Sequence, residues 1–215
     1  MSNVLYTTHA IVLATILFFH QTPRAQSLDE VIRAVEAGNV RQVAGWLDRG
    51  VDGNSTSPSG HSLLMIAART GQRELVSLLV SRRANVRQRS AQGDTALMMA
   101  SLVGDLDIIR TLITAGAELD HPGWTPLHYA AFEGRAPAVQ LLLEKGADKD
   151  ALAPNGYTAL MLAARNGKAE AAKMLLYADP DVNHRTEKGE TALAIARQKN
   201  MRDVEELIRR AGGVE

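Results

Sequence analysis

The chain has 215 residues, in which 24 Lys and Arg balance 24 Asp and Glu. This balance argues against a nucleic-acid-binding protein, which usually carries a strongly basic face, and it leaves local patches as the means of recognition. The sequence contains no cysteine, which excludes disulfide bonds, thiolate metal sites, a cysteine nucleophile and lipid anchors attached through cysteine. The length allows one domain or two.

Residues 1–26 are interpreted as a targeting segment outside the fold. An apolar run of ten residues, 10–19, precedes Pro23 and the small residue Ala25, and it is too short to cross a bilayer. This order is typical of a secretory signal peptide cleaved near Ala25 and Gln26. We therefore predict a periplasmic or secreted protein with no membrane attachment after cleavage. An uncleaved membrane anchor and a buried N-terminal helix are the alternatives.

The rest of the chain, residues 27–215, repeats itself with a period near 33 residues. A glycine followed two positions later by Ser or Thr opens five of the units. These glycines are Gly60, Gly93, Gly123, Gly156 and Gly189, at spacings of 33, 30, 33 and 33. With a further unit at the start, the sequence predicts about six units, which begin near residues 28, 60, 93, 123, 156 and 189.

The unit at residues 123–155 shows how each copy is expected to fold. Thr125 is placed to cap a helix, and Pro126 suits the first helical position, where no backbone donor is needed. A first helix of about two turns follows, and a Glu-Gly pair breaks it. A second helix ends at Gly146, the natural residue for a left-handed helix end. Residues 147–155 have no helical period and are predicted to project as an extended turn.

Two motifs of this unit, Thr-Pro-Leu-His at residues 125–128 and Gly-Ala-Asp at residues 146–148, resemble the ankyrin-repeat family. The resemblance extends from about residue 28 to the end. It implies an all-α repeat solenoid of helix-turn-helix units, whose β-turns project as fingers and whose first helices form a concave face. A helical solenoid of another type is the alternative, and the repeated Gly-x-Thr starts disfavour it.

Departures from the repeat pattern identify places with special properties. Residues 28–59 lack the opening box and are predicted to form an N-terminal capping repeat, while the unit from Gly189 has the polar helices of a terminal cap. Three residues are missing just before Gly123, which predicts a shortened finger. Arg83 and Asp179 stand where glycine is usual and are expected to perturb those helix ends.

The sequence offers no recognisable catalytic, cofactor or metal site. The histidines beyond the N-terminal segment are His61, His121, His128 and His184, and they lack the spacing of metal ligands. We expect His61 and His121 on the surface, and His128 in a structural hydrogen-bonding role with Thr125 and the neighbouring turn. At the position equivalent to His128, three other units have methionine, namely Met65, Met98 and Met161. We therefore expect a protein that is not an enzyme; an enzyme with an unfamiliar site is the alternative.

Basic side chains concentrate at one place, which comprises Arg82, Arg83, Arg87 and Arg89. Such a cluster suits an acidic partner or a phosphate-rich surface. A solvated finger and helix end is the favoured interpretation.

The family resemblance assigns partner recognition to the residues beside the opening glycine and to the pair after Ala-Ala. Aromatic residues are scarce here, yet Trp124, Phe132 and Tyr157 all occupy such positions, and large aromatics dominate interface energetics. The predicted partner-binding residues are Asp94, Leu102, Val103, Trp124, Phe132, Glu133, Tyr157, Arg165, Asn166 and Glu190. The alternative is that Trp124 and Phe132 pack between repeats and fill space left by the shortened finger.

We therefore expect a monomeric module that binds one protein, without nucleic acid or cofactor. Bacterial proteins of similar layout, with a signal peptide followed by a few ankyrin repeats, are associated with the cell envelope. This resemblance implies a module that inhibits, protects or supports a periplasmic enzyme, for example an oxidative-stress enzyme such as catalase. The alternative is a membrane-anchored scaffold that keeps its N-terminal segment.

Overall fold

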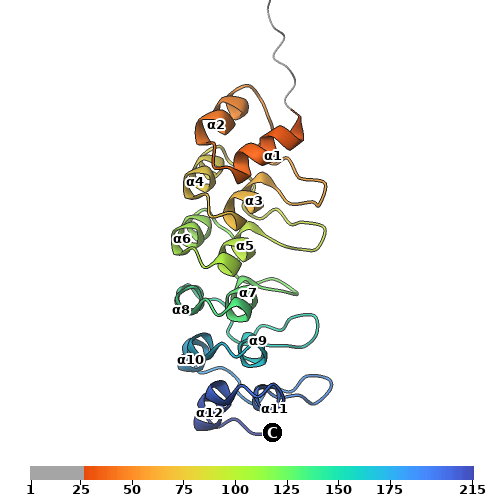
Figure 1. Cartoon of the computed structure of the whole chain (residues 1–215), viewed down its shortest axis with the longest axis vertical. Coiled ribbons are helices and arrows are strands. Elements are labelled where there is room, and N and C mark those ends of the chain that lie inside the picture. The colour runs from red at the N-terminus through yellow and green to blue at the C-terminus, as the bar shows by residue number, and fades with distance from the viewer. Residues whose placement is uncertain (1–26) are drawn as a thin grey trace, which may run out of the picture.

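The computed structural model describes residues 27–215, in which twelve helices form six pairs stacked along one axis (Figure 1). The all-α repeat solenoid predicted from the sequence is thus confirmed. The predicted signal peptide, residues 1–26, lies outside the described residues. Among residues 27–215, none of the helices has the length and apolarity that a bilayer crossing requires.

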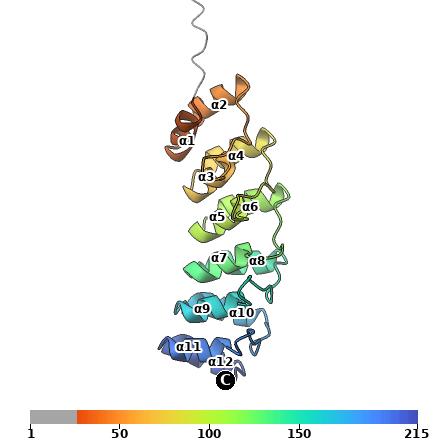
Figure 2. The same ribbon diagram turned by 90° about the vertical axis from the view of Figure 1, so that its right-hand side faces the viewer.

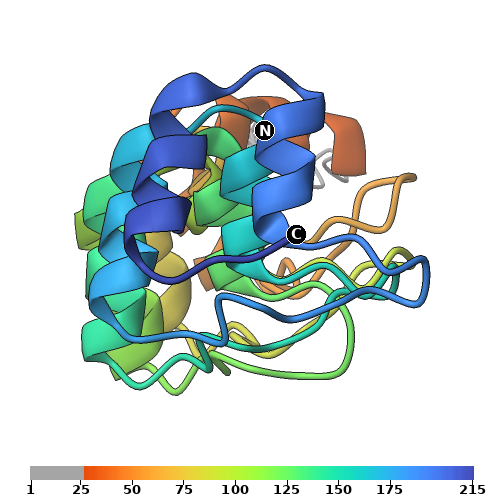
Figure 3. The ribbon, with the colours of Figure 1, turned by 90° about the horizontal axis from the view of Figure 1, so that it is seen from below.

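The first helices of the pairs form one layer and the second helices another, and the fingers extend beside the first layer (Figures 1 and 3). The first helices are α1 (Leu28–Glu36), α3 (Leu63–Arg69), α5 (Ala96–Val103), α7 (Pro126–Glu133), α9 (Ala159–Arg165) and α11 (Ala192–Gln198). The second helices are α2 (Val40–Asp48), α4 (Arg73–Ser81), α6 (Leu106–Thr114), α8 (Ala136–Glu144), α10 (Ala169–Tyr177) and α12 (Arg202–Arg210). We call the surface of the first helices and fingers the inner face, and that of the second helices the outer face.

Hydroxyl side chains start the first helices. A backbone N–H three residues along donates to the hydroxyl of each N-cap, as predicted for Thr125. These caps are Ser27, Ser62, Thr95, Thr125, Thr158 and Thr191. At the other end of α7, Gly134 takes the left-handed conformation with φ 76° and stops the helix as expected.

The core runs without interruption between the two layers. Fully buried alanines such as Ala68, Ala131 and Ala164 lie in the first helices, and their small side chains let neighbouring first helices approach closely. Figure 2 shows the first helices stacked one on another along the axis. Leucines and isoleucines of the second helices, such as Leu79 and Leu112, are equally buried. Each repeat therefore packs on its neighbours, and no repeat has a separate core.

The finger before α7 is shorter than the others, which confirms the prediction. It comprises the 11 residues 115–125, whereas 14 residues form each of the other four connections between pairs. In the longer finger before α5, the Ser90 N–H donates to the Asp94 carbonyl and the Gly93 N–H to the Ser90 carbonyl, both over 2.9 Å. In the described backbone, the finger that contains Trp124 lacks the two corresponding hydrogen bonds. Its turn therefore has a different shape from that of the longer finger.

Asn and Asp side chains link successive repeats near the bases of the fingers. Backbone N–H groups of the next repeat donate to them over 2.7–3.1 Å. The acceptors are Asn54, Asp120, Asp150 and Asn183. At the equivalent position Arg87 instead donates to the Gly116 carbonyl over 2.9 Å. These links hold the fingers in line along the stack.

Arg83 and Asp179 do not change the length of the helices that precede them, so the expected perturbation of those helix ends is wrong. α4 and α10 have the nine residues of the other second helices. Both residues instead take the left-handed conformation, with φ 61° and 55°. Aspartate tolerates this conformation better than arginine, so backbone strain is concentrated at Arg83.

We expect Arg83→Gly to raise the free energy of unfolding by about 0.5–1 kcal/mol. Glycine adopts the left-handed conformation without strain, but it also gives the unfolded chain more conformational entropy, which offsets part of the gain. Denaturant unfolding measures this change. The reverse control is Gly146→Arg, at the equivalent position of another repeat, where φ is 93° and an added Cβ meets no atom within 4 Å. This control should lower the free energy of unfolding. Equal free energies of unfolding for both variants and the wild type would contradict the claim that Arg83 is strained.

Candidate protein-binding site on the inner face

Three of the predicted partner-binding residues line one apolar hollow of the inner face. Leu102 comes from α5, Trp124 from the shortened finger and Phe132 from α7, and the hollow has a volume of about 200 Å³. His128 and Tyr129 of α7 complete its lining. We call these five residues the aromatic pocket.

Trp124 stands against the rings of its own repeat. Its ring centroid lies 5.7 Å from that of His128 and 6.4 Å from that of Tyr129, with interplanar angles of 82° and 83°. Such edge-to-face pairs are favourable for aromatic rings. Trp124 is therefore partly buried against rings of its own repeat, whereas the packing alternative placed it between repeats, and Phe132 is 43% exposed at the edge of the pocket.

His128, which lines the pocket, has the structural hydrogen-bonding role with Thr125 and the neighbouring turn that was predicted. Its Nδ1 accepts from the Thr125 N–H over 3.1 Å, and its Nε2 lies 3.0 Å from the Ala151 carbonyl and 3.1 Å from the Tyr157 carbonyl. Because two carbonyls can only accept, Nε2 carries the proton. Burial lowers the pKa of His128, so the ring is neutral near pH 7.

Tyr129 joins the pocket to the preceding repeat, and it is not among the residues predicted from the sequence. Its hydroxyl donates to Asp94 Oδ1, and burial together with this carboxylate raises the pKa of Tyr129. The phenol therefore stays protonated. A signal was present in the sequence, because the equivalent positions carry hydrocarbon or thioether side chains. They are Ile66, Met99, Leu162 and Ile195.

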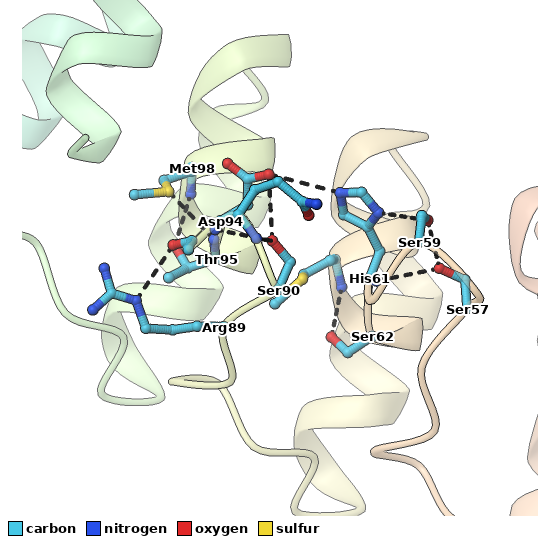
Figure 4. Close-up of polar contacts among 12 residues, drawn as sticks. Ser57, Ser59, His61, Ser62, Arg89, Ser90, Asp94, Thr95 and Met98 are labelled. Carbon is cyan, nitrogen blue, oxygen red and sulfur yellow. Dashed lines mark hydrogen bonds and ion pairs between the residues drawn. The ribbon is translucent and has the colours of Figure 1, made fainter. Parts of the chain in front are cut away.

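A serine, a histidine and a carboxylate meet beside the pocket (Figure 4). Ser59 Oγ lies 2.9 Å from His61 Nδ1, but His61 Nε2 and Asp94 Oδ2 are 3.8 Å apart. That second distance is too long for the hydrogen bond that orients a catalytic histidine. The group is better described as a polar bridge between two fingers. It leaves 19% of the His61 side chain exposed, and His121 is also partly exposed, so both histidines lie at the surface of the fingers as expected, partly covered by their neighbours.

Tyr157 lines a different hollow from Trp124 and Phe132. This polar hollow, of about 370 Å³, also includes Arg165, Lys188 and Glu190. The Tyr157 hydroxyl donates to Glu190 Oε2 over 3.3 Å, while Arg165 is exposed.

The remaining predicted partner-binding residues lie around the two hollows. Val103 is 36% exposed on α5, and Glu133 is partly buried at the end of α7. The Asn166 amide donates to the Phe132 carbonyl over 3.2 Å and so joins the two repeats.

The basic cluster has partners of its own. Arg82 pairs with Asp48, Arg87 with Glu118 over 3.7 Å, and the Arg89 Nε–H donates to the Gly93 carbonyl over 3.3 Å. This supports the interpretation as a solvated finger and helix end. In the described part of the chain, no three His, Asp or Glu side chains gather as metal ligands.

Comparison with known proteins decides the family. The model of a family described as ankyrin repeats in three copies matches residues 31–122, 84–153, 103–186 and 149–213. The chain belongs to the ankyrin-repeat family. The crystal structure of the human ASB11 ankyrin repeat domain shares the fold, with a TM-score of 0.80, 22% identity and coverage of 88% of this chain and 85% of that one.

Curated relatives match over the ankyrin repeats. Protein fem-1 homolog A-like of Mus musculus is 32% identical over 96 residues, which are 44% of this chain and 15% of that protein. Protein phosphatase 1 regulatory subunit 27 of Mus musculus is 34% identical over 123 residues, 57% of this chain and 60% of that one. A putative ankyrin repeat protein of Rickettsia bellii is 28% identical over 119 residues, which are 51% of this chain and 34% of that protein. The chain spans less than two thirds of each relative, and its repeats make it a protein–protein interaction module.

Because burial lowers the pKa of His128, the unfolded chain binds a proton below about pH 6.5 that the folded ankyrin repeats do not bind. The free energy of unfolding should therefore fall as the pH drops below that value, by at most about 1.4 kcal/mol per pH unit from this residue. His128→Met, which copies Met161, should show a smaller loss between about pH 7 and about pH 5.5. Parallel curves for the variant and wild type would contradict this role.

Proposed function

We propose that this ankyrin-repeat protein is a non-enzymatic module that captures one protein partner through its inner face, with the aromatic pocket at the centre. One observation carries the proposal: Phe132 is 43% exposed beside Trp124 in an apolar hollow, in a chain with only 3 Phe and 2 Trp. Grouped aromatic side chains at a surface hollow are typical of interaction sites, because they bury much area when a partner covers them.

The size of the pocket suits a protein side chain. Its volume of about 200 Å³ is smaller than the range of about 300–1,000 Å³ that is typical of pockets for small molecules and cofactors. A single anchoring side chain of a partner fills such a hollow. The polar hollow around Tyr157 and Arg165, one repeat further along, offers a second place of contact for the same partner.

We further propose that the protein is exported, is monomeric and belongs to the bacterial cell envelope. Its partner is then a periplasmic enzyme that it inhibits, protects or supports. The apolar run at residues 10–19 supports export. One relative is named as a regulatory subunit of a protein phosphatase, which supports a regulatory role through binding. Balanced charge supports a protein partner over nucleic acid.

The start of the mature protein tests the exported form. Determination of the N-terminal residue should give a start near Gln26. A mature protein that begins at residue 1 or 2 and stays with the membrane fraction would favour the anchored scaffold.

We expect Phe132→Ala to weaken capture of the partner from envelope extract more than tenfold, because truncating an aromatic anchor typically costs about 2 kcal/mol or more. Trp124→Ala should do the same, although it also removes ring contacts within the protein. Affinity measured by pull-down titration and the unfolding temperature are the two readouts. Since Phe132 is exposed, its truncation should leave thermal unfolding nearly unchanged.

Tyr177→Ala is the matched control, because Tyr177 is 73% exposed on the second helix α10, on the outer face. It should capture the partner as well as the wild type does. Normal capture by Phe132→Ala together with loss of capture by Tyr177→Ala would place the partner on the outer face and reject the proposal.

A further inference from the structure

The aromatic pocket has an unusual composition for an apolar anchor site. Four of its five side chains carry aromatic rings, Trp124, His128, Tyr129 and Phe132, and Leu102 alone is aliphatic. Trp124 meets two of these rings edge to face, so ring planes near 80° apart face the same hollow. The faces of Trp, Tyr and Phe rings attract a cation within about 6 Å of the ring centre.

The lining of the pocket places no positive charge against an entering cation. Its lining contains no Lys or Arg, and the buried His128 is neutral. Arg135, which follows α7, lies beside the pocket residue Leu102 without lining the pocket, and its Nε–H donates to the Leu102 carbonyl over 3.0 Å. A cationic group that enters the pocket therefore meets rings and no positive charge from its lining.

A carboxylate stands at the phenol end of the pocket. Asp94 Oδ1 accepts from the Tyr129 hydroxyl, while Oδ2 has only long contacts, 3.8 Å to His61 Nε2 and 3.5 Å to Ser90 Oγ. Oδ2 thus keeps capacity to accept a strong hydrogen bond. Donation by the hydroxyl to a carboxylate also polarises the phenol and makes the Tyr129 ring more electron-rich, which strengthens its attraction for a cation.

We propose that the aromatic pocket receives an arginine side chain of the partner, with its alkyl stem against Leu102, its guanidinium against the rings of Trp124 and Phe132, and an N–H directed toward Asp94 Oδ2. This inference rests on the proposed function and specifies the residue that anchors the partner. Arginine fits better than lysine, because its planar guanidinium stacks on aromatic faces and is less strongly hydrated than an ammonium group.

Three small probes test the chemistry of the pocket on the full chain. They are the capped amino acids N-acetyl-arginine amide, N-acetyl-citrulline amide and N-acetyl-leucine amide. Citrulline has the shape of arginine without its charge, and leucine represents an ordinary apolar anchor. Binding is followed through the indole N–H resonance of Trp124 in nitrogen–proton NMR spectra, and the buried Trp46 serves as the internal reference.

We expect the arginine probe to shift the Trp124 resonance and to bind about tenfold more tightly than the citrulline probe. Phe132→Leu removes a ring and keeps an apolar side chain, while Asp94→Asn removes the charge and keeps an acceptor for Tyr129. Both variants should reduce the preference for arginine over citrulline. Tyr177→Leu on the outer face should leave it unchanged.

Equal or tighter binding of the citrulline or leucine probe would overturn the inference, and so would an arginine probe that leaves Trp124 unshifted. The two proposals fail separately. If Phe132→Ala loses the partner while the probes bind equally, the pocket is an apolar anchor and the proposed function stands. If arginine binds preferentially while Phe132→Ala captures the partner normally, the pocket recognises a guanidinium but does not anchor that partner.

Discussion

The stack depends on close packing between successive first helices. Their central alanines are fully buried, and such small side chains bring neighbouring helices near enough to align the fingers. This alignment places residues about one period apart in contact along the inner face. Tyr129 thereby reaches Asp94, and Tyr157 reaches Glu190, although each pair is more than thirty residues apart in the chain. The inner face is in this way a consequence of the repeat period.

Irregularity within this regular stack is concentrated in one repeat. The repeat at residues 123–155 has the shortened finger, the histidine of the opening box, and two rings, Tyr129 and Phe132, at positions where the other units that open with glycine have none. In a longer finger, backbone hydrogen bonds close the turn. The turn at Trp124 has no such bonds, and the Trp124 ring packs against the rings of α7. Sequences that depart from their own pattern at one place usually do so at functional sites, because stability alone favours the regular repeat.

Much of the fold follows from the sequence. The glycine spacing gives five of the six repeats, and the Ser or Thr two positions later gives the helix starts, because a cap is a local interaction between residues three apart. The behaviour of Arg83 was harder to predict, since a backbone can keep its helix length and accept strain at one residue. The predicted helix ends were therefore correct in position and wrong in the expected effect of this residue.

The site was predicted only in outline. Position within the repeat led to Trp124 and Phe132, but Tyr129 was missed because an apolar-helix pattern treats its ring as core. The separation of Tyr157 from the aromatic pocket and the partial burial of His61 depend on contacts between repeats. Local patterns do not contain these contacts, although counting one period along the chain identifies the neighbouring residue in most cases.

Photo-crosslinking from the pocket tests the central claim most directly, because it does not require a known partner. A benzoylphenylalanine at position 132 occupies an exposed site at the pocket edge, and the same group at position 177 lies on the outer face. Irradiation in envelope extract should join one protein to position 132 and none to position 177. A crosslinked protein at position 177 with none at position 132 would contradict an inner-face binding site.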